Sequence, residues 1–398
     1  MEPTAEILGG ALAAAFERCA EARVAKAYEP LAPPTPDQAR ELTKQLLASA
    51  IANGLPVLSE GPLQTHELEG GMSSELILRV SRELSAVTKC GNDRAVVTQA
   101  LAIARLKHEE RVGDRWSRLL PAVYVVKSDG PPFAYMMEHF GAPAFTRLWD
   151  LIEESPDSAR TANKDLVLEM VALHKSSFQK RLVPRPKIDY LARIVERLEE
   201  AEEFGPAFPI ISSTVVLNDK PLPTWREVVD RLDESIRHFD PAGVSSIHGD
   251  LHPLNVFVGR DGSLRLIDPK TWTIGDCALD LGKCLHFLEV QRHMPQIVGS
   301  LTVTVSGGRT LVTEASSYKA AAEGLTGPWR LAVAELAREL PDSTLVRRVP
   351  LAIATSLLGQ VPMRVRRGQR REGIVDYVLG LSLLSDCASG PDSIDGRA

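Results

Sequence analysis

The feature that most constrains the fold of this chain is a change in its hydrophobic pattern near Gly141. Before that point, short apolar runs alternate with turn residues, as expected for strands at 63–68, 75–80, 84–89, 122–127 and 133–137. One helical stretch, 94–111, lies among them. After Gly141, apolar residues recur at helical spacing, as in Leu191, Ile194 and Leu198. The pattern predicts an α+β chain in which a small sheet with one helix precedes a larger helical lobe.

Two further helices are predicted ahead of the sheet. Residues 3–27 are rich in alanine, the proline-rich stretch 30–36 interrupts the helix, and 37–51 forms a second one, because proline can start a helix but not continue it. Apolar helical stripes are usually buried, so we expect this extension, residues 1–58, to pack on the following domain, with contact to another subunit as the alternative. The other predicted boundaries are 59–140 for the sheet, 141–388 for the helical lobe and 389–398 for a flexible tail.

The net charge and the cysteine content limit the kinds of partner and the cellular compartment that we expect for this chain. Lys plus Arg number 46 against 52 Asp plus Glu, a net charge of −6, which lacks the basic excess of a nucleic-acid-binding domain. The five cysteines form no Cys-x-x-Cys pair, so we expect a reducing, cytoplasmic compartment. No apolar run approaches the ~20 residues that span a bilayer. We therefore expect a small-molecule or protein partner, with neither nucleic acid nor membrane.

The strongest chemical signal is the stretch Ile247–Asn255, which is followed by a hairpin and then by Asp268. Asp250 and Asn255 lie in a loop before a strand, and Asp268 ends the next strand, so the hairpin can bring Asn255 and Asp268 to one site. Magnesium prefers hard oxygen ligands from one or two carboxylates, with phosphate oxygens and waters completing the octahedron. The sequence predicts Asn255 and Asp268 as magnesium ligands and leaves Asp250 free to receive a proton.

The same stretch resembles a known catalytic loop. His-x-Asp-x-x-x-x-Asn, with an Asp thirteen residues later, resembles the loop and metal-binding Asp of the protein-kinase-like fold. The strings His-Gly-Asp-Leu-His-Pro and Ile-Asp-Pro are similar, more narrowly, to the aminoglycoside phosphotransferase and choline kinase family. Gly275-Asp276 and Asp280-Leu281-Gly282-Lys283 resemble the segment that follows in that family. The resemblance implies two lobes, a small antiparallel-sheet N-lobe and a larger helical C-lobe, with nucleotide between them.

The resemblance also implies a nucleotide site in residues 59–140. The segment 69–74 would be the turn that covers the phosphates, and the lysine that holds them would stand on the third strand, with Arg79 as its competitor. The segment 135–141 would be the hinge whose main chain binds adenine. The implied nucleotide-binding residues are Lys89, Gly70, Gly71, Ser73, Met137, Glu138 and Phe140. Without the downstream motif, the glycines would indicate only a hairpin turn, and Met137 and Phe140 only core residues.

The sequence departs from the family where a Glu should orient the lysine. Gln99 lies near that position and can accept a hydrogen bond from Lys89 without supplying charge, so we expect a weaker pair. The resemblance implies that Asp280 braces the catalytic loop. An acidic cluster at 196–203 would suit a cationic amino sugar, but the pattern favours a solvated helix face. The basic run 364–371 is expected to be exposed surface.

These observations predict an enzyme that transfers the γ-phosphoryl group of ATP, with GTP as the alternative, to a hydroxyl of a small molecule. The family's acceptors include aminoglycosides and other antibiotics, choline-like amino-alcohols, homoserine and hexoses or hexosamines. The residues of the motifs are more similar to those of the sugar and antibiotic kinases. Two other classes stay open: a non-catalytic kinase-like nucleotide-binding module, suggested by Gln99, and a metal-dependent phosphoesterase, suggested by Gly249-Asp250-Leu251-His252. The oligomeric state is left open.

Overall fold

The computed structural model describes residues 34–52, 65–68, 76–80, 86–141, 143–180, 190–235, 239–306, 309–313 and 319–389. These residues form two compact units. Unit 1 comprises the described chain up to Arg147 together with Val256–Thr273, and unit 2 comprises Leu148–Asn255 and the chain from Ile274 onward. The predicted helix 3–27, most of the predicted tail and the turn with Gly70, Gly71 and Ser73 lie outside the described residues.

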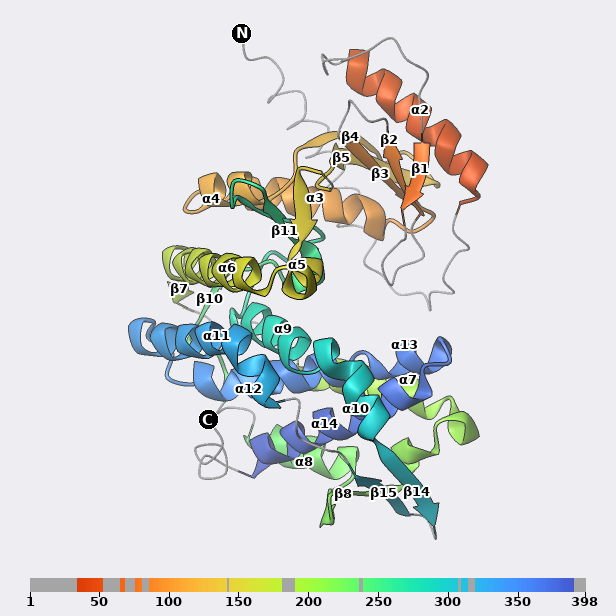
Figure 1. Cartoon of the computed structure of the whole chain (residues 1–398), viewed down its shortest axis with the longest axis vertical. Coiled ribbons are helices and arrows are strands. Elements are labelled where there is room, and N and C mark those ends of the chain that lie inside the picture. Colours follow the sequence, from red (N-terminus) through yellow and green to blue (C-terminus); the bar gives the residue numbers. More distant parts are fainter. Residues whose placement is uncertain are drawn as a thin grey trace. The chain divides into compact units, whose positions relative to one another are not determined.

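Unit 1 contains the predicted antiparallel sheet (Figure 1). Its five strands lie in the order β1-β2-β3-β5-β4, and every neighbouring pair is antiparallel. The strands are β1 (Thr65–Leu68), β2 (Leu76–Val80), β3 (Ala86–Gly91), β4 (Val123–Lys127) and β5 (Phe133–Glu138). A smaller antiparallel sheet consists of β6 (Phe145–Arg147), β11 (Val256–Gly259) and β12 (Leu264–Leu266). The hairpin that leads to Asp268 therefore belongs to the same unit as the large sheet.

Helices cover both faces of the large sheet. Helix α2 (Pro36–Ala52) buries an apolar stripe against one face, where alternate residues of β3 and β5 meet it. The buried residues of this cluster are Ala39, Leu42, Leu46, Ala50, Ala86, Cys90, Ala134 and Met136. The intervening residues Lys89 and Tyr135 point to the other face and contact Gln99 of α3 (Ala95–Lys107). The predicted packing of the N-terminal extension on the sheet is confirmed for α2.

The helix predicted over 94–111 is shorter than expected. Helix α3 ends at Lys107, and a separate helix, α4, spans Gly113–Leu119. The carboxylate of Glu109 accepts hydrogen bonds from the backbone N–H groups of Arg111 and Val112, at 3.2 and 2.8 Å, and so stabilises a turn. A Cβ atom at Gly113 would lie 2.5 Å from the Lys107 carbonyl oxygen, so the chain can fold back this tightly only with glycine.

Unit 2 is mainly helical, as predicted. Its helices are α5 (Leu148–Glu154), α6 (Pro156–Ser177), α7 (Tyr190–Glu202), α8 (Trp225–Ser235), α9 (Ala278–Glu289), α10 (Met294–Ser300), α11 (Lys319–Glu339), α12 (Leu345–Leu358), α13 (Val361–Arg366) and α14 (Arg370–Ala388). Its short strands include β7 (Gln179–Lys180), β10 (Gly243–Ser246) and β13 (Ile274–Gly275). No helix in the described ranges has the length and apolar character of a membrane span.

The core of unit 2 forms where α12 packs on α9 and α14. The helices approach closely at Gly282, where a Cβ atom would lie 2.7 Å from the Cβ of Ala352. Leu281, Leu285 and Leu357 are buried at this contact. Because α9 begins just after the predicted site residues and carries Asp280 and Lys283, this close packing fixes the backbone that presents those two side chains.

A second sheet in unit 2 is only partly predicted by the sequence. The apolar runs 301–305 and 310–312 around Gly307-Gly308 predict a hairpin, which is present as β14 (Thr302–Ser306) and β15 (Arg309–Thr313). However, β15 also pairs in parallel with β8 (Thr214–Leu217), which forms a tight hairpin with β9 (Lys220–Pro221). The turn between β8 and β9 places Asn218 and Asp219 at positive φ, 46° and 64°. Asn-Asp after the apolar run Val215–Leu217 was the sequence signal for this hairpin.

Candidate active site

Lys89 stands at the centre of unit 1's sheet, with its side chain only 3% exposed. Its ammonium group forms an ion pair with the carboxylate of Asp268. The Nζ atom also lies 3.4 Å from Oε1 of Gln99, which accepts a hydrogen bond from the Tyr135 hydroxyl at 3.2 Å. Gln99 thus occupies the orienting position expected from the sequence, and it contributes an uncharged acceptor.

Asp268 follows β12 and has φ of +61°, in the left-handed region that non-glycine residues seldom adopt. Asp is one of the few side chains that tolerate this conformation, and such backbone strain occurs often at functional sites. The side chain is 28% exposed, so part of the carboxylate still reaches solvent while it pairs with Lys89. A carboxylate in this setting can hold a cation as well as the lysine.

The predicted hinge follows the end of β5. Met137 is buried within the sheet, and the Glu138 N–H donates to the Ala122 carbonyl oxygen at 2.8 Å. The Phe140 main chain, by contrast, makes no backbone hydrogen bond with any residue the structure describes. Its ring packs against Phe145, with the ring centroids 5.2 Å apart. Phe140 is therefore the hinge residue whose main-chain groups are most available to a base.

In unit 2, a buried carboxylate supports the backbone of the predicted catalytic loop. Asp280 accepts hydrogen bonds from the backbone N–H groups of His248 and Gly249, at 2.9 and 2.6 Å. Gly249 has φ of +79°, a conformation that glycine adopts without strain. Burial raises the pKa of Asp280 to about 7, although the two hydrogen bonds oppose the shift. Asp280 braces the loop, as expected from the resemblance.

The carboxylate of Asp250 is 20% exposed and has a cation beside it. Nζ of Lys283, from α9, lies 3.1 Å from Oδ1 of Asp250. The Lys283 ammonium also lies 5.2 Å from the centre of the Phe287 ring, on which the ring of His252 is stacked. Phe287 thus supports both side chains next to Asp250. The motif Asp280-Leu281-Gly282-Lys283 did not predict this contact, because sequence spacing does not place Lys283 beside Asp250.

Asn255 closes the catalytic loop in the short 3-10 helix η4 (Pro253–Asn255). Its side-chain amide nitrogen donates to the carbonyl oxygen of Asp250 at 3.0 Å, which fixes the orientation of the amide. Its Oδ1 takes part in no hydrogen bond with the described residues, so this oxygen is available as a hard ligand. Asn255 and Asp268 therefore suit magnesium by chemistry. No trio of His, Cys, Asp or Glu forms a metal cluster within the described ranges.

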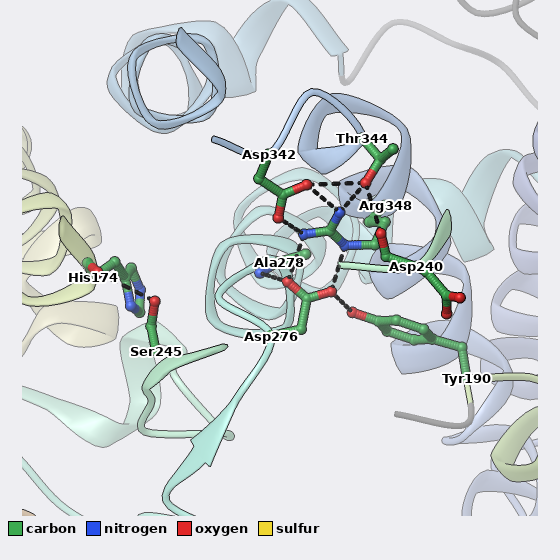
Figure 2. Close-up of polar contacts among 9 residues, drawn as sticks. All are labelled: His174, Tyr190, Asp240, Ser245, Asp276, Ala278, Asp342, Thr344 and Arg348. Atoms are coloured by element: carbon green, nitrogen blue, oxygen red, sulfur yellow. Dashed lines mark hydrogen bonds and ion pairs between the residues drawn. The ribbon is translucent and has the colours of Figure 1, made fainter. Parts of the chain in front are cut away.

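A buried charge network underlies the start of α9 (Figure 2). Arg348 of α12 is fully buried and donates to Asp276 from Nε at 2.6 Å and to Asp342 from the guanidinium at 2.6 and 2.8 Å. The Tyr190 hydroxyl donates to Asp276 at 2.8 Å. The two carboxylates raise the pKa of Arg348 against the effect of burial, so the guanidinium stays charged. An arginine inside the apolar run of α12 was the sequence signal for this network.

The acidic cluster and the basic run meet in the structure. Glu200 of the cluster pairs with Arg197, 2.8 Å away, and with Arg366 of α13. Glu202 pairs with Arg226 at 2.6 Å. In the basic run, Arg364 is not surface as expected, because it pairs with the buried Asp376 at 3.3 Å. Two of the five glutamates in this cluster are thus already bound to arginine.

Comparison with known families supports the sequence prediction. Residues 136–301, which include the whole catalytic loop and Asp268, match the profile of the phosphotransferase enzyme family. No curated protein matches the chain.

Solved structures with the same fold have little sequence identity to the chain. An ethanolamine kinase from Plasmodium vivax has a TM-score of 0.52 at 11% identity, covering 93% of this chain and 93% of its own. The aminoglycoside phosphotransferase APH(4)-Ia has a TM-score of 0.52 at 12% identity, covering 88% of this chain and 98% of its own. A protein described as a fructosamine-3-kinase from Haemophilus somnus has a TM-score of 0.50 at 12% identity, covering 86% and 96%. The chain therefore has the protein-kinase-like fold of small-molecule phosphotransferases, and its residues 136–301 resemble the phosphotransferase enzyme family.

Proposed function

We propose that this protein is an ATP-dependent O-phosphotransferase that moves the γ-phosphoryl group to a hydroxyl of a small molecule. The observation that carries the proposal is the ion pair between Lys89 and Asp268, which lie 179 residues apart in the sequence. A lysine that holds phosphates and a carboxylate that holds their metal ion must meet at the phosphates. The family match and the kinase-like fold support the same assignment.

The proposed roles divide between the two units. In unit 1, Lys89 binds the α and β phosphates, the turn with Gly70, Gly71 and Ser73 covers them, and the hinge at Met137, Glu138 and Phe140 binds the base. In unit 2, Asp250 accepts or orients the proton of the attacking hydroxyl. Such a site works mainly by positioning and by neutralising charge around a loose transition state.

Asn255 and Asp268 are the proposed ligands of Mg²⁺, which neutralises charge on the phosphate oxygens when bound. The free Oδ1 of Asn255 and the partly exposed carboxylate of Asp268 support this pair. ATP is the proposed nucleotide and GTP the alternative. Residues 59–140 are the proposed nucleotide-binding domain, and 141–388 the catalytic and acceptor-binding domain.

The proposed acceptors are antibiotics, including aminoglycosides, and sugars or amino sugars. A role in antibiotic resistance is one form of this activity. The four cysteines that the structure describes are buried and form no disulfide with one another, which supports a reducing, cytoplasmic compartment as the site of action.

The test is a coupled ADP-release assay with Mg-ATP and a panel of hydroxylated antibiotics, hexoses, hexosamines, sugar acids and amino-alcohols. Acceptor-stimulated ADP release is expected from the wild-type protein and should be lost in Asp250→Ala. Asp261→Ala, at the exposed tip of the hairpin between β11 and β12, is the matched control and should retain full activity.

Other outcomes favour the alternative functions. Nucleotide binding by calorimetry without transfer to any acceptor would favour a non-catalytic nucleotide-binding module. Phosphate release from an ester without nucleotide would favour a phosphoesterase. Absence of nucleotide binding would contradict the assignment altogether.

A further inference from the structure

One face of helix α9 lies against the predicted catalytic loop. Asp280, Lys283 and Phe287 are spaced three and four residues apart, so they stand on the same side of this helix. Asp280 accepts hydrogen bonds from the loop backbone at His248 and Gly249. Lys283 and Phe287 follow it along the helix and contact side chains of the loop. Helix α9 therefore holds side chains of the loop as well as its backbone.

The contact of Lys283 is with the carboxylate of Asp250, at 3.1 Å from Nζ to Oδ1. The two side chains are only 18% and 20% exposed, so salt screens this ion pair less than it screens a surface pair. The Lys283 ammonium also lies 5.2 Å from the centre of the buried Phe287 ring. Phe287 thus favours one position of the ammonium group beside Asp250.

Two contacts within the loop fix the backbone of Asp250. Its N–H donates to Nδ1 of His248 at 3.3 Å, and its carbonyl oxygen accepts from the Asn255 amide at 3.0 Å. The terminal torsion of an aspartate side chain has a broad energy minimum, so a fixed backbone does not by itself fix the carboxylate. The hydrogen bond from Lys283 to one carboxylate oxygen supplies that restraint.

His252 is a second candidate for this role, but its geometry does not suit it. Its Nε2 lies 3.9 Å from the same Oδ1 of Asp250, which is beyond hydrogen-bond distance. The amide nitrogen of Asn255 lies 3.2 Å from this Nε2, and an amide nitrogen only donates, so Nε2 is the acceptor and carries no proton. The His252 ring is stacked on Phe287 instead, with the ring centroids 4.0 Å apart. Lys283, rather than His252, therefore donates to Asp250.

We propose that Lys283 is a positioning residue of the phosphotransfer reaction, an inference that rests on the proposed function. Its ammonium group binds one oxygen of Asp250 and so orients the carboxylate toward the acceptor hydroxyl. Lys283 acts through Asp250 and does not itself have to touch the acceptor or the nucleotide. A displacement of about 1 Å at a reacting group can cost about 10²-fold in rate, so loss of this contact should lower turnover rather than binding.

The first test replaces Lys283 by Met, which keeps an unbranched side chain next to Phe287 and removes the charge. In the coupled assay, with the acceptor that gives the highest rate, kcat should fall about 10²-fold. KM for Mg-ATP should stay within about 2-fold of the wild-type value, because the contact is not made to the nucleotide. Lys283→Arg keeps a cation and should restore part of kcat. The matched control is Lys175→Met, which removes an exposed ion pair between α6 and Glu335 and should leave kcat unchanged.

The second test separates positioning from a purely structural role. Lys283→Ala leaves space beside Asp250 that a small ammonium ion can enter. Propylammonium should raise kcat of Lys283→Ala by at least about 5-fold, because its N–H groups can donate to the carboxylate. Tetramethylammonium has the same charge but no N–H group, so it should have no effect. A purely structural role would lower the melting temperature of the variant and would not respond to either ion.

The outcomes distinguish this inference from the proposed function. Wild-type kcat in Lys283→Met would contradict the positioning role and retain the phosphotransferase. So would a kcat that falls only in proportion to the unfolded fraction measured by circular dichroism, or the absence of rescue by propylammonium. Absence of transfer by the wild-type protein to every acceptor in the panel would contradict the phosphotransferase, and the inference with it.

Discussion

The two halves of the proposed site are stabilised in different ways. In unit 1, the residues proposed for chemistry hold each other, because Lys89 and Asp268 form one ion pair between the sheet and the hairpin. In unit 2, Asp250 lies on a loop whose backbone N–H groups donate hydrogen bonds to Asp280. The start of α9, which carries Asp280, is stabilised in turn by the ion pairs of Arg348 with Asp276 and Asp342. Substitutions at the ion pair of unit 1 should therefore reduce activity more than they reduce the stability of the protein. Substitutions of the residues that support the loop of unit 2 should reduce its stability.

The largest expected effect tests the first half. Asp268→Asn keeps a hydrogen-bond acceptor for Lys89 but removes the charge that would hold Mg²⁺. Turnover should fall by at least about 10³-fold. The melting temperature should fall by less than in Arg348→Met, because Asp268 is partly exposed and the Asn oxygen still accepts a hydrogen bond from the buried Lys89 ammonium, although that ammonium loses its counter-charge. Steady-state kinetics and a thermal melt measure both, with Asp261→Asn in the same hairpin as control. A large loss of stability with activity retained would contradict the expected difference between the two units.

The second prediction tests the network of unit 2. Arg348→Met leaves Asp276 and Asp342 buried without their cation. Removing one partner from a buried ion pair typically costs 3–5 kcal/mol, so the melting temperature should fall by on the order of 10 °C. Differential scanning calorimetry measures the change. Arg347→Met, at the adjacent and less buried arginine, should have little effect. Equal melting temperatures of the two variants would show that the network does not stabilise unit 2.

The third prediction concerns pH. Burial lowers the pKa of His174, which lies 3.7 Å from Asp280, to about 4. The unfolded chain binds this proton below about pH 6.5 and the folded chain only below about pH 4, so His174 lowers stability as pH falls through that interval, by at most about 3 kcal/mol.

His174→Gln should remove this slope. The readout is the difference between wild-type and variant melting temperatures from pH 7 to pH 4, because Asp280 and Asp376, with pKa values raised to about 7, act with the opposite sign in the wild type. Since both proteins share those aspartates, the difference isolates His174. Parallel profiles would mean that His174 is accessible to protons in the folded protein.

The smallest expected effect returns to unit 1. Gln99→Glu should strengthen the contact to Lys89 by adding charge, and should lower KM for ATP about 2- to 5-fold. Gln99→Met, which removes the acceptor, should raise it. Nucleotide titrations at saturating acceptor measure the changes. If both variants have the KM of the wild type, Gln99 does not orient Lys89, and the position of this lysine depends on its ion pair with Asp268.

The fold class could be predicted from the sequence because it depends on local patterns, and the proposed site residues come from such patterns too. Alternating apolar runs predicted the sheet, helical spacing predicted the second unit, and the string from His248 to Asp268 predicted the site. The end of α3 at Lys107 and the separate helix α4 were not predicted, because the tight turn at Gly113 depends on a close backbone approach that the apolar pattern does not show. The parallel pairing of β8 with β15 was also missed, since no local pattern specifies a partner 95 residues away.

The sequence by itself determined the chemistry available to this protein: which side chains could bind phosphate, hold magnesium or accept a proton. Only the tertiary structure decided which charges lie next to one another. Lys283 meets Asp250, Arg348 meets Asp276, and Arg366 meets Glu200 because packed helices bring them together. Electrostatic energies depend on distance and burial, not on sequence separation, so the charge presented to an acceptor is a property of the fold.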